Sequence, residues 1–154
     1  MRLHSRLAAI AATAAICLNA AAQDVPAIIP LPAHIETSDG TLMMPQTVGY
    51  RVAAYPGDSI ATVIQRFIPD FEKATGSKFT KSADGAMLTL AVDPSIGAEA
   101  YRLTVDGDGI AIEASRPAGF FYALQTLRQL MPYEVSRSSA ALPYVAIADA
   151  PRFG

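Results

Sequence analysis

One acidic pair has the spacing with which a calcium-binding loop begins: Asp106 and Asp108, each followed by a glycine. An EF-hand loop needs further oxygen ligands at set positions, where this chain has Ile110 and Pro117 instead. Asp and Gly residues also tolerate the positive φ angles of a tight β-hairpin turn. We therefore interpret Asp106 to Gly109 as a turn that binds no metal ion.

The chain has two histidines, and neither belongs to a pattern typical of a metal or catalytic site. His4 lies in the N-terminal leader described below, and His34 stands alone in a proline-rich segment. A zinc site needs three or four ligands. Ser115, Ser136 and Ser138 have no nearby histidine to accept a hydroxyl proton. The sequence thus predicts no metal site, no cofactor and no activated nucleophile.

The carboxylates do not have the spacing of a catalytic acid–base pair either. Asp70 and Glu72 are two residues apart on a predicted helix, so they point to different sides and are expected to be solvated. Glu113 alternates out of the apolar face of a predicted strand, and nothing holds any pair at glycosidase spacing. The six tyrosines and six phenylalanines could form a sugar-binding platform, but most phenylalanines fall on helical core stripes. We predict no catalytic and no substrate-binding residue in this segment.

The first 22 residues have the pattern of a cleaved signal peptide. Arg2 and Arg6 precede an apolar run from Leu7 to Leu18, and Ala20-Ala21-Ala22 is a cleavage motif that would make Gln23 the mature N-terminus. The run is too short to span a bilayer, which takes about 20 residues. Cys17 follows Ile16, whereas a lipoprotein signal has a small residue before its cysteine. We predict an exported protein, periplasmic or extracellular, without a stable membrane span.

Removal of this leader leaves 132 of the 154 residues and no cysteine, which excludes disulfides, thiolate catalysis and Cys-ligated metals from the mature segment. Two of the twelve basic residues are lost with it, leaving ten against fourteen acidic ones. No run of Lys and Arg is present. Nucleic acid is therefore not an expected partner.

The segment from Glu99 to Leu130 is the predicted centre of the fold. Residues 101–105 alternate between apolar and polar, the Asp-Gly turn follows, and residues 110–113 alternate again. Ser115 is placed to cap a helix in which Pro117 occupies the first turn. Five apolar residues then recur at helical spacing: Phe120, Phe121, Leu124, Leu127 and Leu130. This pattern predicts a β-hairpin with a helix laid on its face, and Gly119 is expected to allow close helix–sheet packing.

The flanking segments predict further elements of the same domain. We expect an extended, pinned arm over residues 24–32, a weak hairpin over 35–44, and strands over 48–54, 86–92 and 142–148. A helix should begin at Asp58 or Ser59, run toward Ala74 with a kink or break at Pro69, and stop at Gly76. The predicted fold is α+β, a mixed and mostly antiparallel sheet with two amphipathic helices on one face. We assign residues 23–148 to this domain and 149–154 to a linker.

Three segments also carry a family resemblance. The first comprises Glu99–Leu103, Ile110–Ile112 and Gly119–Leu130, which ends in "TL-x-QL". The second is Ile29-Pro30-Leu31-Pro32, and the third is Val145–Phe153, which contains "I-x-D-x-P-R-F". Together they resemble the N-terminal domain of family 20 glycoside hydrolases, the β-N-acetylhexosaminidases. The proline segment of that family is often followed by glutamine, where this chain has Ala33. The resemblance covers nearly all of residues 26–154.

The resemblance implies that the active site lies in a (β/α)8 barrel following this segment. In that family a substrate acetamido oxygen attacks the anomeric carbon, a glutamate protonates the leaving oxygen, and the preceding aspartate orients the acetamido group. The motif that holds this pair, "H-x-G-G-D-E", has no counterpart in these 154 residues. Arg152 belongs to "P-R-F" and is not the sugar-binding arginine, which follows it in the family. We therefore expect a fragment, inactive alone, whose partners are its own downstream barrel and, through that barrel, a glycan.

Two alternatives remain open from the sequence. Family 84 hexosaminidases and some α-glucuronidases place a similar small α+β domain before a barrel. A stand-alone carbohydrate-binding or scaffolding domain is the other, although the chain shows no row of exposed strand aromatics and has no tryptophan.

Overall fold

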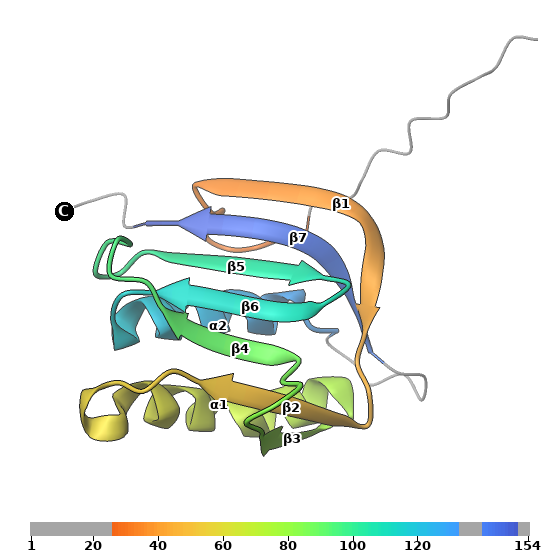
Figure 1. Ribbon diagram of the computed structural model, residues 1–154. Helices are drawn as coiled ribbons and strands as arrows, with labels where there is room; N and C mark the ends of the chain where they lie inside the picture. Colours follow the sequence, from red (N-terminus) through yellow and green to blue (C-terminus); the bar gives the residue numbers. More distant parts are fainter. Residues whose placement is uncertain (1–25, 133–139, 151–154) are drawn as a thin grey trace, which may run out of the picture.

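The computed structural model describes residues 26–132 and 140–150, which form one seven-stranded sheet with two helices (Figure 1). In chain order the elements are β1 (His34–Met43), β2 (Thr47–Val52), the short 3-10 helix η1 (Pro56–Asp58), α1 (Ser59–Thr75), β3 (Lys78–Lys81), β4 (Leu88–Val92), β5 (Tyr101–Asp106), β6 (Gly109–Ala114), α2 (Pro117–Leu130) and β7 (Ala141–Asp149). The strand order across the sheet is β1-β7-β5-β6-β4-β2-β3. Both helices lie behind the sheet in Figure 1 and pack against each other. The predicted α+β class with two helices on one face is confirmed.

The sheet is mixed, and its strand pairings divide evenly. The pairs β1–β7, β5–β7 and β5–β6 are antiparallel, whereas β4–β6, β2–β4 and β2–β3 are parallel. The antiparallel share is thus smaller than expected. One reason is a crossover: α1 carries the chain from β2 back to the start of β3, a four-residue strand absent from the prediction, which makes β2 and β3 parallel. The other two parallel pairs, β2–β4 and β4–β6, join strands that are not consecutive in the chain.

The predicted central hairpin is confirmed. The register of β5 and β6 runs from Tyr101 opposite Ala114 to Asp106 opposite Gly109. The carboxylate of Asp106 accepts hydrogen bonds from the backbone N–H groups of Asp108 (2.9 Å) and Gly109 (3.2 Å). The aspartate therefore closes the turn, as the sequence predicted.

Helix α1 begins and ends where the sequence predicted but differs in its interior. Gly76 ends it with a left-handed φ of 71° and donates its N–H to the carbonyl of Glu72. Asp58 stands at the N-cap without a side-chain capping hydrogen bond. The helix is continuous through Pro69, so the predicted break is wrong. Pro69 and Gln65 are exposed, and the Gln65 carbonyl that loses its helical donor is therefore next to water.

Two local predictions were wrong. Residues 35–44 do not form a hairpin, because β1 is one continuous strand that includes Gly40. It pairs with β7, with a register irregularity between Thr37 and Thr41. Ser115 does not cap α2: Arg116 occupies the N-cap, while the Ser115 hydroxyl donates to the carbonyl of Gly97 at 3.2 Å. In both cases the residues bind a partner that is distant in sequence, β7 for β1 and Gly97 for Ser115, and not the neighbour that the local pattern suggested.

The core lies between the sheet and the helix layer. The predicted apolar stripe of α2 faces it, with Phe120, Leu124 and Leu127 fully buried. Aromatic rings join the two helices, because the ring centroids of Phe67 on α1 and Phe121 on α2 are 5.6 Å apart in an edge-on arrangement. The phenylalanines thus serve packing, as their spacing predicted.

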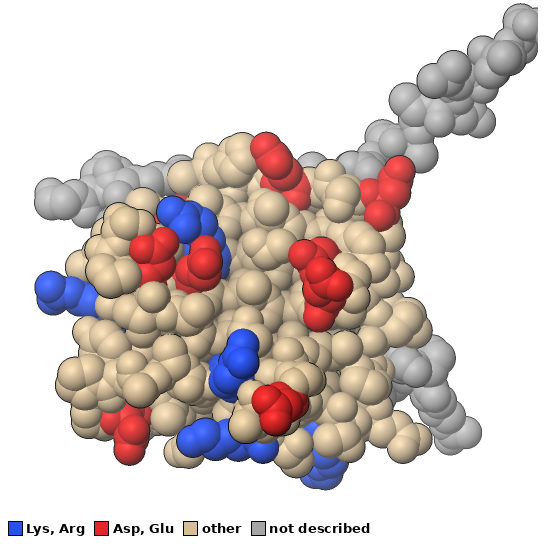
Figure 2. All heavy atoms as spheres, viewed as in Figure 1, with Lys and Arg blue, Asp and Glu red and all other residues tan. Residues whose placement is uncertain are grey.

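The opposite face of the sheet carries interspersed charges of both signs on a largely uncharged surface (Figure 2). Arg102 on β5 contacts Asp93 at 3.1 Å and its cross-strand neighbour Glu113 at 3.3 Å. On this face no band of basic residues gathers that would suit a nucleic acid.

Gly119 sets how closely α2 approaches the sheet. A Cβ at this position would collide with the backbone carbonyl oxygen of Ala100 and would lie 2.8 Å from the Cβ of Ala114. Gly-to-Ala changes inside helices normally stabilise by up to about 1 kcal/mol, because alanine has the higher helix propensity. Here the new Cβ would collide with backbone atoms that cannot easily move aside. A Gly-to-Ala change at this position should therefore destabilise the protein.

We therefore expect Gly119→Ala to lower the unfolding free energy by about 1–3 kcal/mol, measured by urea denaturation. Gly97→Ala is the matched control, since its new Cβ would make an ordinary 3.6 Å contact with Ala100. That control should change stability by no more than about 0.5 kcal/mol. A Gly119→Ala variant as stable as the parent protein would contradict this account of the packing.

Candidate functional site

The residues considered for chemistry from the sequence are dispersed over the described structure. His34 pairs with Glu36 at 3.0 Å on exposed β1, and Asp70 on α1 pairs with Arg128 on α2 at 3.1 Å. No group of three or more His, Cys, Asp or Glu residues within 26–132 and 140–150 could hold a metal ion. Ser136, which was considered as a nucleophile, lies outside the described residues, as do Ser138 and Arg152.

Two carboxylates, Glu72 from the sequence analysis and Asp93 beside Arg102, have partners that lower their pKa values. The backbone N–H of Phe79 and the ammonium of Lys78 lower the pKa of Glu72, which joins the end of α1 to β3. Hydrogen bonds from Ser95 lower the pKa of Asp93, with Arg102 adding to the effect. A lowered pKa keeps both groups ionised at neutral pH, which suits ion pairs and not a general acid.

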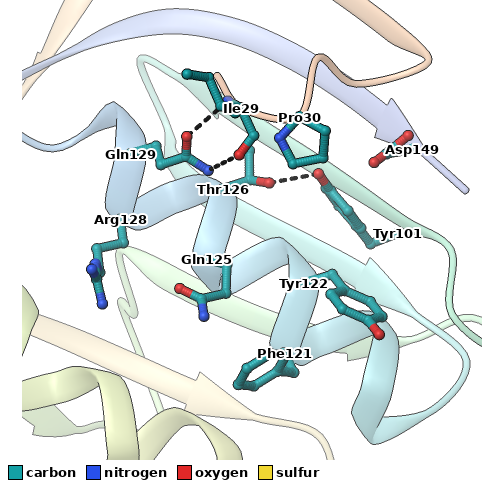
Figure 3. A pocket seen from close by; sticks show the side chains of 10 residues that line it. All are labelled: Ile29, Pro30, Tyr101, Phe121, Tyr122, Gln125, Thr126, Arg128, Gln129 and Asp149. Atoms are coloured by element: carbon teal, nitrogen blue, oxygen red, sulfur yellow. Dashed lines mark hydrogen bonds between the residues drawn. The ribbon is translucent and has the colours of Figure 1, made fainter. Parts of the chain in front are cut away.

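A pocket of the described structure lies between the N-terminal arm (residues 26–33) and the side of α2 (Figure 3). Its volume is about 430 Å³. We call it the arm–α2 groove; its lining residues are Ile29, Pro30, Tyr101, Phe121, Tyr122, Gln125, Thr126, Arg128, Gln129 and Asp149.

Gln129 fixes the arm to the last turn of α2. The N–H of Ile29 donates to Oε1 of Gln129 at 2.8 Å, and Nε2 of Gln129 donates to the carbonyl oxygen of Ile29 at 3.2 Å (Figure 3). The side-chain amide thus pairs with both backbone polar groups of one residue. This pair confirms that the arm is pinned to the body, with Ile28 buried beneath it.

A buried pair lies at the floor of the groove. The hydroxyl groups of Tyr101 on β5 and Thr126 on α2 are 2.6 Å apart (Figure 3). Burial raises the pKa of Tyr101, and the negative charge of Asp149 adds to the rise while the Thr126 hydrogen bond opposes it. The phenol therefore stays protonated at neutral pH and ties helix to sheet.

Asp149, at the end of β7, also contributes to the groove. Its carboxylate accepts the backbone N–H of Ala33 at 3.0 Å, so the arm is held at a second point. The arm and the last described strand therefore meet at one place, although their residues are more than 100 positions apart in sequence.

The polar groups of the groove are largely paired with one another. Gln129, Thr126, Tyr101, Asp149 and Arg128 all have the partners given above. Gln125 and the hydroxyl group of Tyr122 are exceptions, since the described part of the chain supplies no hydrogen bond to either side chain. The groove therefore offers apolar surface more than free donors and acceptors, and none of its groups is prepared for acid–base chemistry.

The groove was not predicted from the sequence, although several of its residues lie in the segments that carry the family resemblance. Thr126 and Gln129 are the polar members of the "TL-x-QL" segment, and Ile29 opens the proline segment. The signal was the presence of polar residues within a helix that otherwise follows an apolar pattern. It did not say which backbone groups these residues would bind.

The family follows from comparison with known proteins. Residues 25–150 match the domain model described as glycosyl hydrolase family 20, domain 2. The chain belongs to glycosyl hydrolase family 20. The match confirms the resemblance to β-N-acetylhexosaminidases and decides against the family 84 and α-glucuronidase alternatives.

Similar proteins include the N,N'-diacetylchitobiase of Vibrio harveyi, 29% identical over 137 residues that cover 86% of this chain and 15% of that protein. A β-hexosaminidase of Porphyromonas gingivalis is 30% identical and is matched over 82% of this chain and 17% of its own length. A mutant Streptomyces plicatus β-hexosaminidase, solved in complex with the product GlcNAc, superposes with a TM-score of 0.71 and 26% identity over 82% of this chain and 26% of that chain.

The chain thus spans less than a fifth of the length of the two curated relatives. Within the described residues, no helix is long and apolar enough to cross a membrane. The signal peptide predicted at residues 1–22 lies outside the described structure and stays a prediction.

The contact between Gln129 and Ile29 can be tested directly. We expect Gln129→Ala to accelerate hydrogen exchange of the Ile29 amide and to lower stability by about 0.5–1.5 kcal/mol, because both hydrogen bonds are lost. Gln125→Ala is the matched control from the same helix and the same groove, and it should leave exchange at Ile29 unchanged. Equal exchange in the two variants would mean that Gln129 does not hold the arm.

Proposed function

We propose that this chain is the N-terminal, non-catalytic domain of an exported β-N-acetylhexosaminidase. The whole protein would hydrolyse terminal N-acetylhexosamine residues of glycans by substrate-assisted, retaining catalysis. The observation that carries the proposal is the family 20 domain 2 match over residues 25–150.

Two further observations support a division of labour within that protein. Within the described residues, no group of three or more His, Cys, Asp or Glu side chains could hold a metal ion. The named relatives are about six to seven times longer than the matched segment, since it covers 15% and 17% of their lengths. The chemistry would then reside in the (β/α)8 barrel that the family resemblance implies downstream of residue 154.

The activity assay uses an aryl N-acetyl-β-glucosaminide as substrate. We expect the whole protein to release the aryl group and residues 23–154 alone to release none, because the segment lacks the aspartate–glutamate pair. An aryl β-glucoside, which has no acetamido oxygen to attack the anomeric carbon, is the matched control substrate and should be hydrolysed far more slowly. Hydrolysis by residues 23–154 would overturn the non-catalytic assignment, and an inactive whole protein would overturn the enzyme assignment.

Export rests on the leader sequence. We expect the mature protein to begin at Gln23, which mass spectrometry of the N-terminal peptide from the producing cells would reveal. Substituting Ala22→Arg should block cleavage, since the motif requires a small residue there. A mature protein that retains residues 1–22 without that substitution would contradict the prediction.

A further inference from the structure

The face of the sheet opposite the two helices carries mostly small side chains. In the central strands, buried core residues alternate with residues that point to this open face. The open-face residues of these strands are predominantly alanine and threonine: Thr89, Ala91, Thr104, Ala111, Ala146 and Ala148. Figure 2 views the open face, which is largely uncharged between scattered charged residues. Within residues 26–132 and 140–150, no second layer of structure covers it (Figure 1).

The direction of the strands makes an uncovered face unusual in one half of this sheet. Antiparallel sheets commonly leave one face in water, whereas parallel strands are normally covered on both faces. Here β2 is parallel to both β3 and β4, and β4 is also parallel to β6. In the described structure the helices cover only one face of these strands. The open face of the parallel half is therefore where a second layer is expected.

The strand registers align the open-face side chains in two neighbouring rows that cross the sheet. The first, which we call the Glu36–Arg51 row, passes over six strands in the order Glu36, Ala146, Thr104, Ala111, Thr89 and Arg51. The second, the Arg102–Glu113 row, passes over five strands in the order His34, Ala148, Arg102, Glu113 and Ala91. The first row thus has a carboxylate at one end, a guanidinium at the other and small side chains between them.

Both rows are self-complementary under a two-fold rotation. The axis lies parallel to the strands, midway between β5 and β6, and brings the open faces of two copies together. Each row then meets the same row of the second copy in reverse order, as in any isologous contact. Glu36 lies opposite Arg51 of the second copy, and Arg102 lies opposite Glu113. Packed sheets cross at about 30°, and the long side chains at the row ends can reach across the offset that this angle introduces.

The charged groups that this contact needs are accessible. The side chains of Arg102 and Glu113 are 52% and 44% exposed, although they contact each other within one copy. Glu36 is 70% exposed beside His34. Arg51 is exposed, and its guanidinium has no ion pair among the described residues. Contact with a second copy would give Arg51 a carboxylate partner.

The chemistry of the open face favours a second copy over other partners. Charges of both signs do not suit a polyanion. The centre presents mainly the methyl groups of alanine and threonine, and these gain from burial against an equally apolar surface. Six strands spaced by about 4.8 Å, with about five residues each, give a face of roughly 25 Å by 16 Å. Such an area is at the lower end for specific interfaces, so association is expected at micromolar concentrations.

We infer that the open face of the sheet is an isologous dimer interface whose partner is a second copy of this protein. The β5–β6 hairpin lies at its centre, and the Glu36–Arg51 contacts lie at its two ends. The inference goes beyond the proposed function and does not rest on it, since the contact involves no catalytic group.

Charge reversal in the whole protein tests the interface by sedimentation equilibrium over micromolar concentrations. We expect the parent protein to shift from monomer to dimer. Glu36→Lys and Arg51→Glu should each raise the dissociation constant at least about tenfold, because each places like charges opposite one another at both ends of the interface. An equimolar mixture of the two variants should associate like the parent protein, because each reversed side chain then faces an opposite charge.

Lys81→Glu is the matched control and should associate like the parent protein. It changes the net charge as Arg51→Glu does, and Lys81 is exposed on the same sheet. Its register opposite the buried Tyr50 directs it to the helix side instead of the open face. Equal weakening by Lys81→Glu would overturn the inference, because the effect would then follow net charge alone.

Three further results would overturn the inference. They are a monomer at all concentrations up to about 100 μM, a dimer unaffected by both reversals, and a dimer that requires added N-acetylglucosamine oligomers. A mixture that does not recover association would overturn the two-fold arrangement.

A second measurement does not depend on charge. Thr104→Cys lies beside the proposed axis, so a short bismaleimide should cross-link it between copies at least about ten times faster than Lys81→Cys, with peptide mass spectrometry identifying the linked residues. Equal cross-linking of the two variants would contradict the interface. Neither measurement depends on turnover, so an inactive protein that dimerises would refute the enzyme assignment alone, and an active monomer would refute the interface alone.

Discussion

The depth at which α2 lies on the sheet is the constraint on which the arm–α2 groove depends. At Gly119 the helix backbone comes so near β6 and the Ala100 carbonyl that no side chain fits between them. This approach brings Thr126, two turns further along, within 2.6 Å of the Tyr101 hydroxyl. It also places Gln129 beside the arm. A helix displaced outward by one methyl group would lengthen the contact between Thr126 and Tyr101, which crosses the interface of α2 and the sheet.

Local patterns predicted most of the fold. The period-two runs of β5 and β6, the Asp-Gly turn between them and the apolar stripe of α2 were sufficient, because each element buries one face against its sequence neighbour. Prediction failed where a distant partner decided the outcome. The Gly40 region became part of a long strand through β7, and β3 exists because β2 offers a free edge. Neither partner is visible within a local window.

Less of the candidate site than of the fold could be predicted from the sequence. Composition and spacing predicted neither a carboxylate pair nor a histidine cluster, and within the described residues no group of three or more His, Cys, Asp or Glu could hold a metal ion. The groove could not be predicted, because it is formed by an arm, a helix and a strand end that are joined by side-chain-to-backbone bonds. Such bonds need a side chain of the right length but no particular spacing. Nothing in the spacing of Gln129 therefore marked it as the residue that binds the arm.

The groove also shows how a sequence segment can be typical of a family while its polar residues serve the fold of the domain. Catalytic groups need unsatisfied hydrogen-bonding capacity or a shifted pKa that poises them for proton transfer. In this domain the polar residues of the recognisable segments use their capacity on the domain itself: Thr126 on Tyr101, Gln129 on Ile29, and Asp149 on Ala33. Their hydrogen bonds join α2 to the sheet and fix the arm beside the end of β7. A sequence signature of this kind records how the domain is held together.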